Sequence, residues 1–233
     1  TQLGRAETAV QSAATAWSLL PGDRASVSRL IEETLRAHPQ LFGMAVALPK
    51  TQRGADFRIL YGFRDGATVR VADRPQPNLD YLEDWFYLPY NLRRPVWSEP
   101  YYDSTSQTRM VTYSAPVLRN GRVVAILTGD LPLDWIRQLL GTLSLDEGSS
   151  AVLLSKQGFF ISHPDRRVEM RETVFSLAET LATPEATAEL KDLGWSMLRD
   201  EPGQRFYRRP LDGRRSYINH RPVASVGWVA GVI

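Results

Sequence analysis

Aromatic side chains gather in residues 80–134, where their spacing matches neither a helix face nor a strand face. They are Tyr81, Trp85, Phe86, Tyr87, Tyr90, Trp97, Tyr101 and Tyr102. Two strand-like segments follow, and the second carries an acid, Asp130. A carboxylate beside aromatic rings suits an ammonium group, because the acid supplies charge and each ring face contributes about 0.5–2 kcal/mol once water is excluded. This pattern predicts a binding site for a small cation.

A purely structural role explains the same residues equally well. Trp85, Phe86 and Trp97 have the size of core residues. Asp130 lies just before a helix expected near Leu133, where aspartate is a favoured N-cap. The spacing alone leaves both interpretations open.

Catalytic and metal-binding patterns are weak by comparison. The acids Glu83, Asp84, Glu99 and Asp103 lie close in sequence and would be the residues of a carboxylate-dependent hydrolase. Loop carboxylates are more often solvated or bonded to turns, however. The three histidines, His38, His163 and His220, are far apart, and glycine-rich phosphate loops and a G-x-S-x-G elbow are absent from the sequence. We therefore predict no catalytic site, no metal site and no cofactor.

Composition indicates an ordered globular chain. Its 233 residues are 43% hydrophobic, carry a formal net charge of +2 and include no cysteine, which excludes disulfides and thiolate metal sites. So small a net charge argues against nucleic-acid binding. The apolar runs are too short to cross a bilayer. Because the sequence opens inside a helical pattern and ends on a strand-like one, we expect it to be a piece of a longer protein.

Two helices are predicted at the start. Val10, Ala13 and Trp17 recur at helical spacing, and residues 21–23 end that helix. A second helix carries its apolar face from Val27 to Leu35. The stripe of the first helix would serve either a dimer contact or packing on the chain's own sheet.

Strands dominate the next part. They are expected at Phe42–Leu48, Arg58–Phe63 and Thr68–Ala72. After the aromatic segment, which we interpret as mainly loop, Met110–Leu118 and Val123–Leu131 flank Asn120-Gly121, a pair typical of a tight hairpin turn. A short amphipathic helix at 133–143 and a linker at 146–150 follow.

A second module begins at Ala151. Strands are predicted at 152–155 and 159–162, helices near 173–181 and 185–198, and closing strands near 205–207, 216–220 and 226–233. Neighbouring strands joined as hairpins, with helices inserted, favour an α+β fold with antiparallel sheets. We predict a helical stalk at 1–40 and modules at 41–145 and 146–233.

Several ordered motifs resemble the double Cache (dCache) extracytoplasmic sensor domains of bacterial signal-transduction receptors. The first module carries Leu60-Tyr61-Gly62-Phe63-Arg64, Asp84-Trp85-Phe86 after Tyr81, a run from Trp97 to Asp103, Val111–Pro116 with Tyr113, and Gly129-Asp130. The second carries Leu153–Gly158, Ile161–Pro164 and Arg221-Pro222-Val223 before Gly227-Trp228. The resemblance covers nearly the whole chain. It implies a long N-terminal helix followed by two PAS-like modules, the membrane-distal one binding the ligand.

The resemblance also implies a ligand site. Amino-acid-binding members use a tryptophan-aromatic pair, a tyrosine after Glu-Pro and an aspartate that ends the hairpin, matched here by Trp85-Phe86, Tyr101 and Asp130. They place an arginine two residues before the tryptophan, where this sequence has Glu83. An acid there repels a ligand carboxylate, so we expect an amine, a quaternary ammonium compound or an amino-acid-like molecule. Arg58, Arg64 or Arg109 would rescue carboxylate binding. The predicted ligand-binding set is Tyr61, Tyr81, Glu83, Trp85, Phe86, Tyr101, Tyr113 and Asp130.

The predicted function is therefore extracytoplasmic sensing. We expect no enzymatic activity in this chain, a small-molecule ligand, a homodimer in the full-length receptor, no nucleic acid, and attachment to the membrane through spans outside the sequence, on the periplasmic side. The expected output is of the histidine kinase or phosphatase type. A secreted hydrolase and a protein-interaction module are the alternatives.

Overall fold

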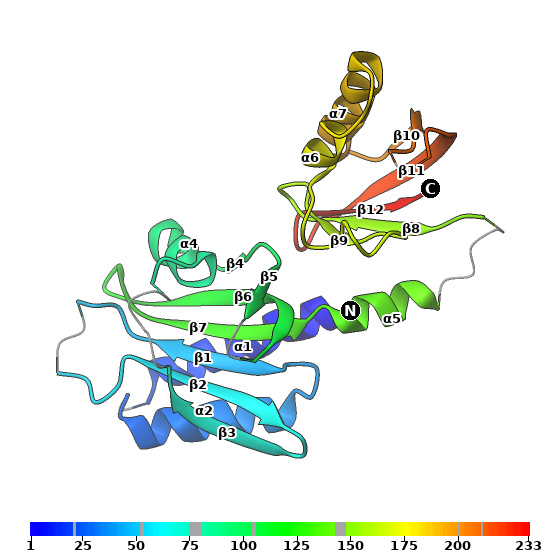
Figure 1. Ribbon diagram of the computed structural model, residues 1–233. Coiled ribbons are helices and arrows are strands. Elements are labelled where there is room, and N and C mark those ends of the chain that lie inside the picture. Colours follow the sequence, from blue (N-terminus) through cyan, green and yellow to red (C-terminus); the bar gives the residue numbers. More distant parts are fainter. Residues whose placement is uncertain are drawn as a thin grey trace. The chain divides into compact units, whose positions relative to one another are not determined.

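The computed structural model describes residues 1–20, 22–51, 54–74, 81–103, 106–142, 148–199, 201–210 and 212–233. They form two compact units, one of residues 1–98 and 102–132, the other of residues 99–101 and 133–233. Each unit is an antiparallel sheet with helices (Figure 1), which confirms the predicted α+β fold with two PAS-like modules. Residues 1–40, which were predicted as a helical stalk, lie in the first unit. The second unit resumes at Leu133, whereas the second module was predicted to begin at residue 146. The predicted linker falls partly outside the described residues.

The first unit is built on a seven-stranded sheet in the order β3-β2-β1-β7-β6-β4, with β5 also paired to β6. Its elements are α1 (Gln2–Ser18), α2 (Arg24–Ala37), β1 (Gly43–Ala47), β2 (Ile59–Asp65), β3 (Thr68–Asp73), α4 (Asp84–Leu92), β4 (Val96–Trp97), β5 (Tyr101–Asp103), β6 (Thr108–Arg119) and β7 (Arg122–Pro132). The strand β1 lies between β2 and β7 and brings them together although they are far apart in sequence.

Helices α1 and α2 pack along this sheet (Figure 1), and two strand glycines let them approach closely. A Cβ atom on Gly129 would lie 2.5 Å from Cγ2 of Val10, and one on Gly62 would lie 2.3 Å from Cγ2 of Ile31. The apolar stripe of α1, including Ala13 at 4% exposure, is thus buried against the chain's own sheet. That packing, rather than a dimer contact, explains the stripe.

The hairpin of β6 and β7 confirms the strongest local prediction. Its two turn residues, Asn120 and Gly121, have φ values of 50° and 72°, as the tight turn requires. The paired strands continue from Arg119↔Arg122 to Met110↔Pro132. This register places Thr112 directly opposite Asp130.

The aromatic segment is not mainly loop, because it contains the helix α4. The sequence hides this helix for two reasons: Glu83, its N-cap residue, makes no side-chain capping bond, and Pro89 lies within it. Proline removes a backbone donor inside a helix. The helix instead depends on packing, since Trp85, Phe86 and Pro89 are buried.

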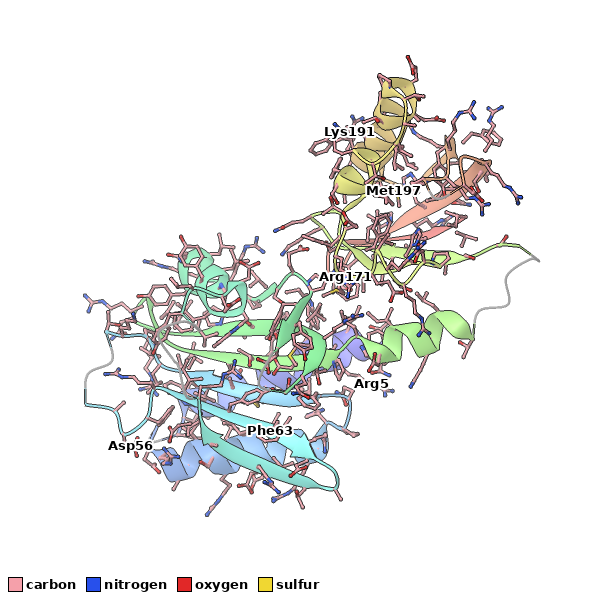
Figure 2. The ribbon with its side chains drawn as sticks, viewed as in Figure 1. Arg5, Asp56, Phe63, Arg171, Lys191 and Met197 are labelled. Carbon is pink, nitrogen blue, oxygen red and sulfur yellow. The ribbon has the colours of Figure 1, made fainter. Side chains whose placement is uncertain are left out.

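The second unit is a five-stranded sheet in the order β10-β11-β12-β8-β9. Its elements are α5 (Asp134–Gly141), β8 (Ala151–Leu154), β9 (Phe160–Ser162), α6 (Val174–Ala178), α7 (Pro184–Leu198), β10 (Gly203–Arg208), β11 (Arg215–Val223) and β12 (Trp228–Val232). Apolar side chains of α6, α7 and the sheet form its core, among them Met197 at 2% exposure (Figure 2).

His220 on β11 is a buried polar residue of this unit. It is 1% exposed, and neither ring nitrogen has a hydrogen-bond partner in the part of the chain that the structure describes. The ring fits because Gly203 opposite it has no side chain: a Cβ there would lie 2.4 Å from Nε2. Burial, followed by the charge of Arg205, lowers the pKa of His220. The imidazole is therefore held neutral.

We expect acid to destabilise the protein through His220. A lowered folded-state pKa means that the unfolded chain takes up the proton first, so stability falls as the pH drops below about 6.5. Replacing His220 by leucine removes this contribution and flattens the dependence. Urea unfolding of both proteins at pH 7.5 and pH 5 measures it. Equal losses of stability in the two proteins would contradict the prediction.

Candidate functional site

The carboxylate of Asp130 is the centre of the candidate site. Asp130 is 3% exposed. Its Oδ1 accepts a hydrogen bond from Thr112 Oγ1 at 2.7 Å, and its Oδ2 accepts one from Tyr61 Oη at 2.9 Å. Both donors are neutral hydroxyl groups. Neither contact is an ion pair, so the acid is held in place by neutral donors in an environment that disfavours its charge.

The bond from Tyr61 crosses a whole strand. Tyr61 comes from β2 and Asp130 from β7, with β1 between them. Gly43 on β1 makes the crossing possible, because a Cβ there would lie 2.3 Å from the Tyr61 hydroxyl oxygen and 2.9 Å from Asp130 Oδ2. A side chain at this position would occupy the space where the two groups meet.

A second acid and one cation lie near this pair. Arg74 Nη2 contacts Asp103 Oδ1 at 3.3 Å, and both side chains are largely buried. The same guanidinium lies over the Tyr61 ring, 5.1 Å from its centroid. Phe63, two residues along β2 (Figure 2), stacks on Tyr61 with centroids 5.9 Å apart. Two carboxylates, one guanidinium and aromatic rings thus surround the candidate site.

The electrostatics follow from this arrangement. Burial raises the pKa of the Asp130 carboxyl, and the negative charge of Asp103 raises it further. The hydrogen bonds from Thr112 and Tyr61 and the charge of Arg74 act in the opposite direction. A positive ligand group placed here would relieve the cost of ionising Asp130.

Asp130 does not cap a helix. The N-cap residue of α5 is Leu133, and it makes no side-chain capping bond. Both Asp130 oxygens are instead bonded within the sheet. The structure therefore excludes the helix-cap interpretation of this acid.

The predicted rings of α4 form a buried cluster around Phe86. Tyr81 and Trp85 meet it edge-on, with centroids 4.6 and 6.0 Å away, and Tyr90 stacks on it at 5.6 Å. The Tyr81 hydroxyl donates to the backbone oxygen of Leu48 at 2.6 Å. Since Tyr81, Trp85 and Phe86 are 5–8% exposed, they do not form the open aromatic surface that an interaction module would need.

Three predicted residues are placed differently. Tyr113 alternates with Thr112 on β6 and points to α1, where its hydroxyl accepts a bond from Gln11 Nε2 at 2.6 Å. Glu83 is exposed just before α4. Tyr101 is half-buried on β5, two residues before Asp103, so both side chains leave the same side of that strand. The structure thus brings Tyr61 to Asp130 and turns Tyr113 away.

The arginine of the candidate site is Arg74, which the sequence did not indicate. Arg64 donates to the backbone oxygens of Leu41 at 2.9 Å and His38 at 3.2 Å, and also to that of Leu35, so it closes the end of α2. Arg109 is exposed and Arg58 half-buried. Arg74 follows β3 in a segment without periodicity, and only the fold reveals its proximity to Tyr61.

Comparisons with known proteins identify the class. Residues 27–138 match the family described as methyl-accepting chemotaxis protein-like, first PDC sensor domain. The chain is 24% identical over 149 residues to the methyl-accepting chemotaxis protein PscA of Pseudomonas syringae pv. tomato, covering 63% of this chain and 23% of that receptor. The chain therefore spans about a quarter of that relative's length.

Solved structures share the fold. The periplasmic sensory domain of the Campylobacter jejuni chemoreceptor Tlp1 superposes with a TM-score of 0.77 at 14% identity, over 99% of this chain and 87% of that one. The ligand-binding domain of the Pseudomonas aeruginosa PAO1 amino acid chemoreceptor PctC, in complex with GABA, gives 0.65 at 19% identity, over 96% and 87%.

These matches support a sensor domain of the double Cache type: residues 27–138 match the first sensor domain of chemoreceptor-like proteins, and the fold is shared with a chemoreceptor sensory domain. Sensor domains of this kind are ligand-binding modules and not enzymes, which argues against the hydrolase alternative. Of the acids that hydrolase would use, Glu83 is exposed and Glu99 lies 3.9 Å from Lys156 in the second unit. The described residues contain no helix long and apolar enough to span a membrane.

We expect Gly43→Ala to displace the Tyr61 hydroxyl from Asp130. The new Cβ overlaps that oxygen, and overpacking of this kind costs about 1–3 kcal/mol of unfolding free energy. Urea unfolding measures the loss. Because the clash involves the hydroxyl, Gly43→Ala should cost less in a Tyr61→Phe background than in the wild type. Equal costs in the two backgrounds would show that the hydroxyl is not what Gly43 accommodates.

Proposed function

We propose that the first unit binds a small molecule through a primary or quaternary ammonium group, with Asp130 as the counter-charge. The observation that carries this proposal is the burial of Asp130 between two neutral hydroxyl donors. A buried carboxylate is costly unless it is paired, and a ligand cation supplies the missing charge. Tyr61, whose hydroxyl contacts Asp130, places an aromatic ring beside such a group.

The local charges support the same ligand class. Asp103 and Asp130 are both acids, and Arg74 is the cation whose charge acts on Asp130. Arg74 also contacts Asp103. When both acids are ionised, this set of three groups carries one excess negative charge. Asp103, rather than the exposed Glu83, is the second acid near the ligand.

A zwitterionic amino-acid-like ligand is the second candidate, and Arg74 is the observation that favours it. A guanidinium binds a carboxylate with a matched pair of donors. If Arg74 exchanged Asp103 for a ligand carboxylate, Asp130 would still take the ammonium. The GABA complex of PctC, a structural relative, supports this class.

The surrounding protein is proposed to be a membrane receptor. The chain would lie on the periplasmic side, in a homodimer attached through membrane spans, with a cytoplasmic output of the chemoreceptor or histidine kinase type. Ligand binding would shift α1 relative to the sheet, because a ligand changes a population only when it binds two conformations differently. Support comes from the chemoreceptor relatives and from the packing of α1 on the ligand-site sheet.

Calorimetry with choline, putrescine, GABA and common L-amino acids tests the ligand class. We expect an ammonium compound to bind and Asp130→Asn to weaken binding by about 2 kcal/mol or more, roughly thirtyfold in Kd. Arg74→Gln separates the two candidates, because it weakens a zwitterion strongly and an amine little. Binding that Asp130→Asn leaves unchanged would overturn the proposal.

Asp130→Asn should stabilise the ligand-free protein at neutral pH. The raised pKa of Asp130 means that the folded chain holds the proton more tightly than the unfolded chain, so the stability from this group falls as the pH rises above about 4. Asparagine keeps the shape and removes the charge. Urea unfolding at pH 7 should therefore show Asp130→Asn to be more stable than the wild type. A less stable variant would indicate that the carboxylate is satisfied without a ligand.

A further inference from the structure

Helix α1 is fastened to the sheet by two hydrogen bonds as well as by its apolar stripe. Trp97 Nε1 on β4 donates to Glu7 Oε1 at 2.8 Å, and Gln11 Nε2 donates to Tyr113 Oη on β6 at 2.6 Å. Glu7 and Gln11 are one helical turn apart and lie on the same side of α1.

The two side chains on the sheet that make these bonds also form a pair. Trp97 and Tyr113 lie directly opposite each other in the β4–β6 register, with ring centroids 5.1 Å apart. One turn of the helix is therefore bonded to one cross-strand pair. A displacement of that pair relative to the rest of the sheet would pull on both bonds together.

Three of the six buried apolar side chains of α1 are alanines: Ala6, Ala9 and Ala13, each at most 4% exposed. Leu3, Val10 and Trp17 are the larger ones, and Val10 packs closely opposite Gly129. Hydrogen bonds are directional, so the two bonds of α1 add to this packing in setting its register on the sheet.

Strand β6 also contacts the acid of the candidate site, which lies on the neighbouring strand β7. Thr112, the residue before Tyr113, donates its hydroxyl to Asp130 Oδ1 at 2.7 Å. Its backbone N–H donates to Ser98 Oγ at 3.0 Å, and its backbone oxygen accepts from the Ser98 N–H at 2.9 Å. Ser98 is the residue after Trp97. On β6, one peptide link separates Thr112, which contacts Asp130, from Tyr113, which contacts α1. On the β4 side, one peptide link separates Ser98, which contacts Thr112, from Trp97, which contacts α1.

We propose that Thr112 and Ser98 transmit the state of Asp130 to α1, with Trp97 and Tyr113 as the positioning residues that set the helix register. This inference rests on the proposed sensor function and names its first mechanical step. A cation bound at Asp130 competes with the Thr112 hydroxyl for Oδ1. Because side chains alternate along a strand, a movement of Thr112 on the ligand face moves Tyr113 on the helix face.

Hydrogen exchange of the α1 amides tests the proposal without any ligand. Asp130→Asn changes the strength of the bond to Thr112, and we expect exchange of amides between Arg5 and Thr15 to change severalfold. In a background carrying Trp97→Phe and Tyr113→Phe, which leave an aromatic ring at each position but remove both hydrogen bonds, the response to Asp130→Asn should disappear. An equal response in both backgrounds, or no response in the wild-type background, would overturn the proposal.

A double-mutant cycle gives a second measurement. Asp130→Asn and Gln11→Met change residues on opposite faces of the sheet, and we expect their effects on the unfolding equilibrium constant to differ from additivity by more than about twofold, the scatter of independent sites. Thr8→Ala is the matched control on α1, because Thr8 is exposed and its hydroxyl donates to the Gly4 backbone oxygen within the same helix. Additive behaviour of Gln11→Met would contradict the coupling. Since no ligand is added, a failure of the ammonium proposal in calorimetry leaves both results interpretable.

Discussion

A carboxylate buried in the middle of a sheet is the constraint on which the first unit depends. Asp130 is bonded to two hydroxyl groups, and neither neutralises it. Removing an ionised group from water without a counter-charge is among the largest penalties in a folded protein. The fold therefore bears a cost that the proposed cationic ligand would reduce. This explains why a residue with a raised pKa lies at the centre of a binding module.

Glycines make this arrangement sterically possible on both faces of the sheet. Gly43 opens the ligand face so that Tyr61 reaches across β1 to Asp130, whereas Gly62 and Gly129 open the other face to α2 and α1. The strands are thus shared between a polar site and a closely packed helix layer. Successive residues of one strand lie on opposite faces, which is the physical basis of the proposed coupling between the site and the helices.

Glu83 stands where an arginine was expected from the resemblance, and the fold changes the meaning of this difference. From the sequence, the acid at this position was used to predict the charge of the ligand. In the structure Glu83 is exposed, and the charges that act on Asp130 come from Asp103 and Arg74. That the ligand carries a positive group remains a proposal. It now rests on Arg74 and Asp103, at the ends of β3 and β5, and no longer on Glu83 at the start of α4.

The sequence by itself determined the features that depend on local physics. The hairpin follows from Asn120-Gly121, whose backbone conformations suit the turn, and α1 and α2 follow from their apolar periods. The motifs from Tyr61 to Asp130 indicated the family. Only the tertiary structure decided which face each side chain occupies and which distant residues meet. Helix α4 lacks a capping bond and contains Pro89, so packing rather than propensity forms it. Arg74 lies over the Tyr61 ring, and Tyr113 points to α1. Both placements follow from the register of strands that pair across distant segments, and this register is not a local property of the chain.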